Sequence, residues 1–348
     1  MRKTTKIVDI GGVKIGGNNP VAIQSMCNTD TRDVKATVNQ ILRLEEAGCE
    51  IIRVAVPDKE AAAAVADIKK AIHIPLVVDI HFDYRLALEC MKNGADKVRI
   101  NPGNIGGTDR VKKVVETAKE RSVPIRIGVN GGSLEKELIE KYGGPTADAL
   151  VESAMRHVKI LENEDFDNTV VSIKISNVPV MIEAYRKFSE ISDLPLHIGV
   201  TEAGTLRSGI IKSAIGIGSL LSGGIGDTMR VSLTADPVEE IYAAYDIQRI
   251  LGLRKKGVQL VSCPTCGRTR INLIEIANEV EKRLANVDKD ITVAVMGCAV
   301  NGPGEAREAD IGIAGGCGEG LIFRKGQIIK KVPENRIIDE LMNEIEKI

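Results

Sequence analysis

Four cysteines in the last quarter of the chain have the spacing of a metal or redox site. Cys263 and Cys266 form a C-x-x-C pair, and Cys298 and Cys317 follow singly in glycine-rich segments. Thiolates at this spacing can bind zinc, exchange disulfides or hold an iron–sulfur cluster. Zinc would favour a second C-x-x-C pair, and a thioredoxin-like pair would leave Cys298 without a role, so we favour the cluster. Its fourth ligand is either Cys317 or an oxygen ligand such as Glu305.

A second chemical feature is a set of basic residues inside short apolar segments that we expect to be strands. These are Arg53, Arg99, Arg126, Lys174 and Arg230. Strand side chains alternate between two faces, and an unpaired cation buried against helices is costly, so we expect all five to point into a barrel. Converging cations indicate an anionic substrate, because the arginine fork binds phosphate oxygens in pairs. The alternative is that some form structural ion pairs with carboxylates such as Asp79 and Glu202.

Polar residues on the same strand faces as these cations, and others just after the strands, would complete an anion site. The candidates for substrate binding are Asn101, Asn130, Ser232, Asp79 and His81. Glu202 follows the seventh expected strand and is the preferred acid–base residue, because a positioned carboxylate can carry a proton. We expect the surrounding cations to depress the pKa of such a carboxylate.

The elements that would position these residues alternate strictly. Eight apolar, β-branched segments are expected strands, at residues 21–26, 51–56, 76–80, 97–100, 125–129, 170–175, 196–200 and 228–232. A helix-like segment follows each one, which predicts a parallel sheet covered by helices. Eight units match a (β/α)8 TIM barrel, whereas the alternative, a doubly wound open sheet, usually has fewer strands. The basic and polar residues then lie toward the carboxyl ends of strands, where barrel enzymes carry their chemistry.

The rest of the chain predicts a small α+β domain. A charged linker at 254–257 precedes a strand, a helix and a second strand, followed by a β-meander and a final helix. We therefore expect a substrate-binding TIM barrel at residues 1–253 and a cluster domain at residues 258–348.

Composition excludes several other classes of protein. The 348 residues carry 47 Lys+Arg against 48 Asp+Glu, so no overall positive charge attracts nucleic acid. Seven cysteines, an odd number in a chain too long to need disulfide staples, favour a reducing compartment. No signal-peptide pattern or membrane-length apolar run is present, so we expect a cytoplasmic protein without a membrane partner.

Nine motifs together point to a known family. They are QSMCNTDT, VVDIHFD, VRINPGN, IRIGVNGGSL, SIKISN, HIGVTEAG, GIGDTMRVSLT, CPTCGR and MGCAVNGPGE. From about residue 7 to residue 333 the sequence resembles the 4-hydroxy-3-methylbut-2-enyl diphosphate synthases of the methylerythritol phosphate pathway, in their compact bacterial form. The pairing of CPTCGR with MGCAVNGPGE is the most specific part of this resemblance.

The resemblance implies a TIM barrel followed by a [4Fe-4S] domain similar to those of sulfite reductases. The implied cluster ligands are Cys263, Cys266, Cys298 and Glu305, which leaves Cys317 as a small buried or loop thiol. The implied contacts to the substrate diphosphate come from Arg53, Arg99, Arg126, Lys174, Arg230 and Ser232, supported by Asn101 and Asn130. Glu202 would act as acid and base.

The implied reaction is a reductive ring opening and dehydroxylation in isoprenoid biosynthesis. It converts 2-C-methyl-D-erythritol 2,4-cyclodiphosphate to 4-hydroxy-3-methylbut-2-enyl diphosphate, with two electrons passing from flavodoxin or ferredoxin through the cluster. The resemblance also implies a head-to-tail homodimer, in which the cluster of one chain caps the barrel mouth of the other. Two alternatives are a zinc-stabilised phosphate-binding barrel and a cluster-based redox sensor, which needs no cationic barrel mouth.

Overall fold

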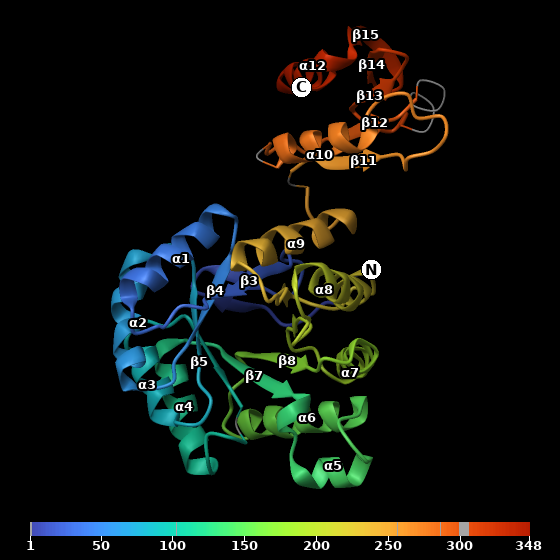
Figure 1. Ribbon diagram of the computed structural model, residues 1–348. Helices are drawn as coiled ribbons and strands as arrows, with labels where there is room; N and C mark the ends of the chain where they lie inside the picture. Colours follow the sequence, from blue (N-terminus) through green and yellow to red (C-terminus); the bar gives the residue numbers. More distant parts are fainter. Residues whose placement is uncertain (1, 102, 256, 286, 299–305) are drawn as a thin grey trace. The chain divides into compact units, whose positions relative to one another are not determined.

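The chain forms two compact units, Met1–Leu253 and Arg254–Ile348 (Figure 1). A computed structural model describes residues 2–101, 103–255, 257–285, 287–298 and 306–348. In this part of the chain, no helix combines the length and the apolar composition that crossing a bilayer requires.

The first unit is a barrel of parallel strands. Its strands are β3 (Ala22–Met26), β4 (Ile51–Ala55), β5 (Leu76–Asp79), β6 (Lys97–Ile100), β7 (Ile125–Asn130), β8 (Thr169–Lys174), β9 (His197–Ile198) and β10 (Thr228–Met229). They pair in the order β8-β7-β6-β5-β4-β3-β10-β9. A parallel bridge between Val171 and Leu196 joins β8 to the segment before β9, which closes the ring. The predicted TIM barrel is confirmed, although β9 and β10 are shorter than expected.

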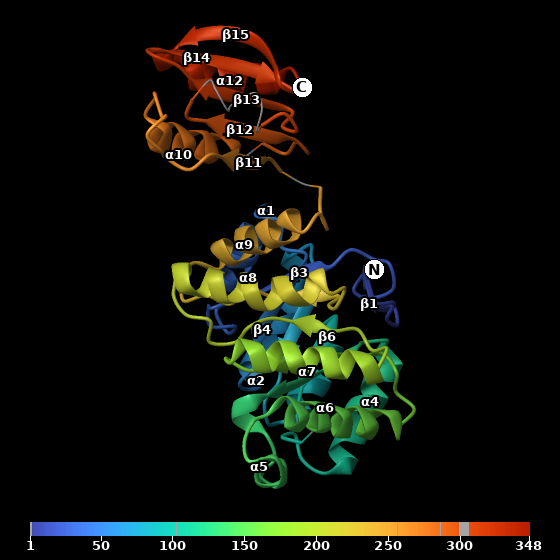
Figure 2. The same cartoon turned by 90° about the vertical axis from the view of Figure 1, so that its right-hand side faces the viewer.

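Helices surround this sheet, as the two views in Figures 1 and 2 show. They are α1 (Val34–Glu46), α2 (Lys59–Ala71), α3 (Tyr84–Lys92), α4 (Thr108–Arg121), α6 (Ala147–Glu162), α7 (Val178–Ile191), α8 (Leu206–Ser222) and α9 (Pro237–Ile250). Asp33, Asp58 and Asp83 each begin a helix by accepting a backbone N–H with the side chain. An additional turn η1 (Gly131–Ser133) and helix α5 (Lys136–Tyr142), which we did not predict, lie between β7 and α6.

Strand residues divide between two environments. Ile52, Val78 and Val98 point outward and join the large apolar cluster between strands and helices. Their neighbours of opposite parity point into the barrel, so the interior can carry polar groups while the outer layer supplies the hydrophobic core.

An unpredicted hairpin closes the amino-terminal end of the barrel. Strands β1 (Val8–Ile10) and β2 (Val13–Ile15) pair antiparallel across Gly11 and Gly12, which both have positive φ, as the tight turn requires. The hairpin side chains pack on the first inward residues of four strands; this floor cluster contains Val8, Ile10, Ile15, Ala22, Ile51, Val77 and Val170. The barrel therefore has an apolar floor.

The second unit is a five-stranded sheet in the order β11-β12-β13-β14-β15. Its elements are β11 (Gln259–Ser262), α10 (Leu273–Leu284), β12 (Thr292–Met296), β13 (Ile311–Gly315), β14 (Glu319–Arg324), β15 (Gln327–Pro333), η2 (Glu334–Arg336) and α12 (Ile337–Glu346). Strands β11, β12 and β13 are parallel, and β14 and β15 complete the antiparallel meander. The α+β prediction is confirmed, except that α10 begins about one turn later than expected.

Candidate active site

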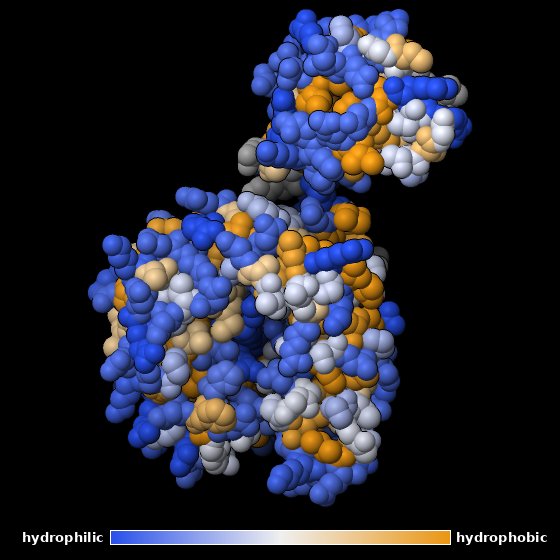
Figure 3. Space-filling model, viewed as in Figure 1, coloured by the Kyte–Doolittle hydropathy of each residue, from blue (hydrophilic) through white to orange (hydrophobic). Residues whose placement is uncertain are grey.

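Six basic side chains line the interior of the barrel in the described part of the chain. They are Arg53, Lys97, Arg99, Arg126, Lys174 and Arg230. Five of them are the cations chosen from strand parity, and the structure brings these five together. Lys97 lies two residues before Arg99 and has the same parity, so it joins them. Figure 3 shows that the barrel is hollowed on the face in view and that hydrophilic residues lie deep in the hollow.

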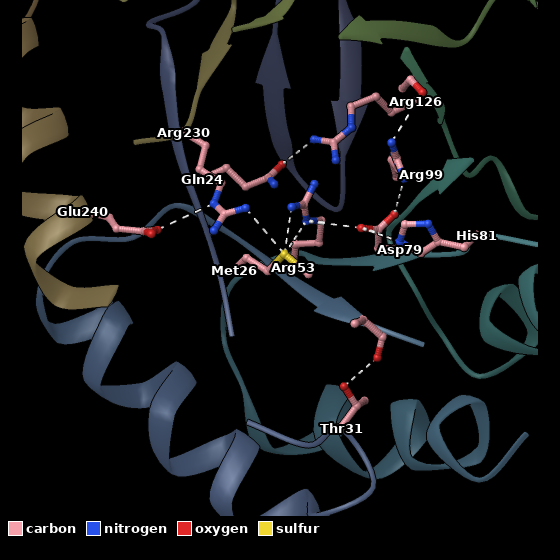
Figure 4. A network of polar contacts seen from close by, with 12 residues as sticks. Gln24, Met26, Thr31, Arg53, Asp79, His81, Arg99, Arg126, Arg230 and Glu240 are labelled. Atoms are coloured by element: carbon pink, nitrogen blue, oxygen red, sulfur yellow. Dashed lines mark hydrogen bonds and ion pairs between the residues drawn. The ribbon is translucent and has the colours of Figure 1, made fainter. Parts of the chain in front are cut away.

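Two carboxylates partly balance this positive charge. Asp79 Oδ1 accepts a hydrogen bond from Arg99 Nη1 at 3.0 Å, and its Oδ2 lies 3.9 Å from Arg53 Nε (Figure 4). Glu240 enters from α9 and places Oε2 3.6 Å from Arg230 Nε. Among the described residues, Lys97, Arg126 and Lys174 form no ion pair. The interior thus keeps a surplus of positive charge, which structural pairing does not remove.

Asp79 is a permanent anion in this setting. Its burial alone would raise the pKa of the carboxyl, but Arg53, Arg99 and Arg126 outweigh that effect and lower the pKa to about 2. At neutral pH the Asp79 side chain is therefore charged, so it holds arginines and is unsuited to donate a proton.

A methionine sulfur receives two of the guanidinium groups. Met26 Sδ lies 3.0 Å from Arg53 Nε, 2.7 Å from Arg53 Nη2 and 3.5 Å from Arg230 Nη1 (Figure 4). A thioether is a weak acceptor. These donors are consequently held in position by a partner that an anionic oxygen can readily replace.

Arg126 is fully buried and poorly satisfied. Its Nη1 donates to Gln24 Oε1 at 3.3 Å, whereas Nε and Nη2 have no partner among the described residues. Burial is the main cause that lowers the pKa of Arg126 and of Lys174, and the neighbouring cations lower it further. Buried donors of this kind normally find acceptors, so the interior is suited to an anion that the protein does not itself provide.

Glycine at position 128 makes room for one of these cations. A Cβ atom on Gly128 would lie 2.3 Å from Arg99 Nε and 2.6 Å from Arg99 Nη2. The Arg99 side chain therefore rests directly on the backbone of β7, where any larger residue would displace it.

The strand-end candidates occupy different environments. Asn101 is buried, and its Oδ1 accepts from the backbone N–H of Gly103 at 3.0 Å. His81 is exposed, with Nε2 3.7 Å from Asp79 Oδ2. Asn130 and Ser232 are both half-buried. The last two thus have the accessibility that contact with a ligand requires, while Asn101 already has a backbone partner.

Glu202 lies in the loop after β9 with its backbone in the left-handed region. Its φ is 53° and the residue is exposed. A non-glycine residue rarely adopts this conformation, which costs of order 1 kcal/mol and is found preferentially at functional sites. The loop therefore holds Glu202 in an unfavourable backbone state, and its acid–base role stays a prediction.

The cysteines of the second unit follow the carboxyl ends of its parallel strands. The register pairs Ser262 of β11 with Val295 of β12, so Cys263 and Cys298 both follow carboxyl ends of adjacent parallel strands. The backbone N–H of Gly297 donates to Cys263 Sγ at 3.2 Å, which connects the two loops. Cys266 is exposed, and backbone and side-chain hydrogen bonds from Arg268 lower the pKa of its thiol, so that the thiolate is favoured.

This donor set fits the sulfur chemistry of an iron–sulfur cluster. Thiolates beside backbone N–H donors are the usual environment of such clusters. Glu305 lies outside the described residues, as does the whole of 299–305. Within the described ranges, His, Cys, Asp and Glu side chains form no group of three or more placed to hold a metal ion. Cys317 is exposed at the turn between β13 and β14, in agreement with a loop thiol.

Comparison with known families resolves what kind of protein carries these two sites. Residues 5–245 match the GcpE TIM-barrel domain, and residues 259–347 match the GcpE protein C-terminal domain. The chain belongs to the GcpE family. The predicted resemblance is confirmed, and membership makes the chain an enzyme of a family in which an iron–sulfur cofactor is expected.

Curated relatives in the GcpE family match over the whole chain. A protein of Caldanaerobacter subterraneus subsp. tengcongensis is 63% identical over 347 residues, covering 100% of this chain and 98% of the relative. One of Clostridium perfringens is 62% identical over 347 residues, covering 100% of this chain and 99% of the relative. Both are named 4-hydroxy-3-methylbut-2-en-1-yl diphosphate synthase (flavodoxin).

Solved structures share the barrel at low sequence identity. Dihydropteroate synthase of Yersinia pestis has a TM-score of 0.53 at 13% identity, covering 72% of this chain and 100% of its own. The enzyme of Stenotrophomonas maltophilia also has a TM-score of 0.53 at 13% identity, covering 71% and 97%. At this identity the likeness concerns the barrel fold alone.

Proposed function

We propose that this member of the GcpE family is a 4-hydroxy-3-methylbut-2-en-1-yl diphosphate synthase that uses flavodoxin or ferredoxin as its reductant. Its substrate would be 2-C-methyl-D-erythritol 2,4-cyclodiphosphate. Counted for the fully protonated forms, two electrons and two protons convert this substrate to 4-hydroxy-3-methylbut-2-enyl diphosphate and one water. The surplus of buried cations in the barrel is the observation that carries this assignment, because it suits a polyvalent anion as ligand.

The diphosphate would bind in the barrel interior. Arg53, Arg99, Arg126, Lys174 and Arg230 supply the cationic donors, and Ser232 adds a hydroxyl. Oxygens of the diphosphate would take over the guanidinium donors that now reach only Met26 Sδ. Asn101, Asn130 and His81 would support the ligand from the strand ends. Asp79 would act by keeping the guanidinium of Arg99 in place, at 3.0 Å.

Glu202 would move the proton that the leaving group needs. Departure of the substrate hydroxyl as water requires a proton at that oxygen, and an exposed carboxyl held by the loop after β9 can supply it. Asp79 is the less suitable donor, because its low pKa keeps it ionised.

Cys263, Cys266, Cys298 and Glu305 would hold a [4Fe-4S] cluster, which supplies one-electron transfer when bound. Hydrogen bonds from Gly297 to Cys263 and from Arg268 to Cys266 would stabilise the thiolates. A reducing compartment such as the cytoplasm would keep these thiols available.

The family resemblance further suggests a head-to-tail homodimer, in which the cluster of one chain caps the barrel mouth of its partner. Sedimentation at decreasing protein concentration, with activity measured alongside, tests this arrangement. Full activity of a strictly monomeric enzyme would contradict it.

The deciding experiment is an iron and acid-labile sulfide count on anaerobically purified full-length protein, combined with turnover of the cyclodiphosphate. We expect a brown protein with about four irons per chain that reduces the substrate. Arg126→Met should abolish turnover and leave the cluster spectrum unchanged, whereas Arg186→Met, at an exposed arginine of α7, should alter neither. A colourless protein with one zinc, or a cluster protein without turnover, would contradict the proposal in favour of a zinc-stabilised barrel or a redox sensor.

A further inference from the structure

Lys97 is a fully buried amine close to the floor of the barrel. Its exposed fraction is 0%, and its register partner on β5 is Val77, a member of the floor cluster. Lys174, the other interior amine, lies four residues beyond the floor residue Val170 on β8, about 13 Å further along the strand. Lys97 is therefore the deep amine of the interior, and Lys174 is the one closer to a bound ligand.

The surroundings of Lys97 offer it no counter-charge. Within the described residues, its Nζ has no hydrogen-bond partner and takes part in no ion pair. From the helices, Glu240 of α9 reaches Arg230, and the buried hydroxyl of Tyr185 of α7 donates to the backbone oxygen of His197. The polar and titratable groups that face the interior from the strands and their ends are Gln24, Arg53, Asp79, Arg99, Arg126, Asn130, Ser172, Lys174, His197, Thr228 and Arg230. The one carboxylate of this set, Asp79, is engaged by Arg99 at 3.0 Å.

Among these groups, Lys97 is well suited to shed charge when the site is free. A guanidinium does not lose its proton in proteins, so the interior arginines stay charged. Burial lowers the pKa of Lys97 well below 10.5, and Arg126 and Arg53 lower it further. A neutral amine avoids both the cost of burying a charge and the repulsion from these two guanidiniums.

His197 is a weaker candidate for the same role. Burial is the main cause that lowers the pKa of its ring well below 6.5, and the charges of Arg126 and Lys174 lower it further. Its Nδ1 also lies 2.8 Å from Thr228 Oγ1, a partner that does not require a charged ring. The ring is thus neutral in the free protein by a wide margin at neutral pH.

We propose that Lys97 is a proton-linked positioning residue of the anion site, neutral in the free protein and converted to an ammonium when a polyvalent anion binds at Arg53 and Arg126. This inference rests on the anion-binding part of the proposed function. Arg126 and Arg53 both act electrostatically on Lys97, so an anion between their guanidiniums acts on the same amine with the opposite sign. Binding then takes one proton from solvent, and Lys97 becomes the innermost counter-charge of the ligand.

The sign of the pH dependence follows from this linkage. The bound anion raises the pKa of Lys97, so protons are taken up between the free and the bound pKa values. Affinity is highest at the acidic end of that window and falls as pH rises through it. For one full proton, the dissociation constant rises about tenfold per pH unit.

Isothermal titration calorimetry of sulfate binding to the full-length holoenzyme tests the proposal, because the charge of sulfate is constant from neutral to alkaline pH. Titrations in buffers of different ionisation enthalpy should give an uptake approaching one proton per sulfate in the wild type. Lys97→Met should bind sulfate with about one proton less uptake than the wild type and with a correspondingly flatter pH profile. The matched control Lys112→Met, at an exposed lysine of α4, should keep the wild-type uptake.

Several results would overturn the inference. Wild-type binding without proton uptake contradicts it directly, whatever the variants do, and so does an unchanged uptake in Lys97→Met. If Lys97→Met does not fold, Lys97→Gln replaces it in the same titrations. Absence of any sulfate binding would overturn the anion site itself, and this inference with it, whereas binding without uptake leaves the proposed function intact.

Discussion

Replacing Asp79 by asparagine removes the carboxylate that Arg99 and Arg53 share. The side chain keeps its shape, and its Oδ1 can still accept from Arg99 Nη1, now at 3.0 Å. The change therefore tests charge and leaves packing nearly constant. After it, Glu240 is the remaining carboxylate near the interior cations of the described barrel. We expect the free protein to lose stability and to become more dependent on a bound anion.

The expected loss follows from the titration of Asp79. Lowering the pKa of its carboxyl from 3.8 to about 2 corresponds to about 2.5 kcal/mol in favour of the folded, charged form. Breaking a buried ion pair by removing one partner costs about 3–5 kcal/mol in measured cases, which sets the upper end. For a unit of this size, about 2.5 kcal/mol lowers Tm by roughly 5–10 °C. The Asp79 contribution is complete above pH 3.8 and disappears as pH falls through about 2, so neutral pH measures all of it.

Thermal unfolding of the anaerobic holoenzyme, followed by circular dichroism with and without inorganic pyrophosphate, provides the assay. At about 100 times its dissociation constant, a ligand stabilises the folded state by about 2.7 kcal/mol. Pyrophosphate should raise the Tm of Asp79→Asn more than that of the wild type, because it replaces the missing negative charge. Asp67→Asn, which loses an exposed contact to Lys70 at 3.1 Å, should shift Tm by no more than about 1–2 °C. A Tm of Asp79→Asn equal to that of the control, or a smaller response to pyrophosphate than in the wild type, would refute the conclusion that the barrel interior carries a surplus of positive charge.

Further substitutions test the other parts of the molecule. Gly128→Ala should weaken pyrophosphate binding about tenfold or more in calorimetry, because the new Cβ would lie 2.3 Å from Arg99 Nε and displace the guanidinium; unchanged affinity would show that Arg99 does not contact the ligand. Glu202→Gln should retain pyrophosphate affinity and lose about 10²–10⁴-fold in turnover, and wild-type turnover would exclude the acid–base role. Ile10→Ala should destabilise the barrel by about 2–5 kcal/mol in denaturant unfolding, because Ile10 is fully buried in the floor cluster; a loss below about 1 kcal/mol would contradict the sealing role of the hairpin. Cys266→Ser should reduce the iron content and bleach the visible absorbance, while Cys90→Ser, at a buried thiol of the barrel, should keep both.

Strand parity carried most of the predictive information about the barrel. An arginine between apolar neighbours, such as Arg53 between Ile52 and Val54, has only one inexpensive direction in a sheet covered by helices, and the structure shows that direction. Lys97 was missed because it is the first residue of β6, where a lysine is ordinarily a solvent-facing strand end. The floor hairpin was missed because strands of three residues have too few alternating positions to give a pattern.

Partners that come from other elements leave no local signal. Glu240 reaches Arg230 from α9, and Met26 offers a sulfur from a segment that looks apolar. Neither contact follows from spacing, because each joins residues through the closure of the barrel. Glu305 illustrates the opposite case: the family motif assigns it a role, while it lies outside the described residues and its position stays a prediction.

The arrangement of charge explains why an unpaired set of cations can persist in a folded core. Arg126 is fully buried and has no carboxylate partner among the described residues, which by itself destabilises the barrel. Adding acidic partners would remove that cost and would equally remove the attraction for an anion, because each new carboxylate would compete with the ligand for the same donors. Asp79 and Glu240 represent a compromise: they hold Arg99 and Arg230 in place and leave the net charge positive. The missing stabilisation is then recovered when the anion binds, so that affinity for the ligand and instability of the free barrel have the same electrostatic origin.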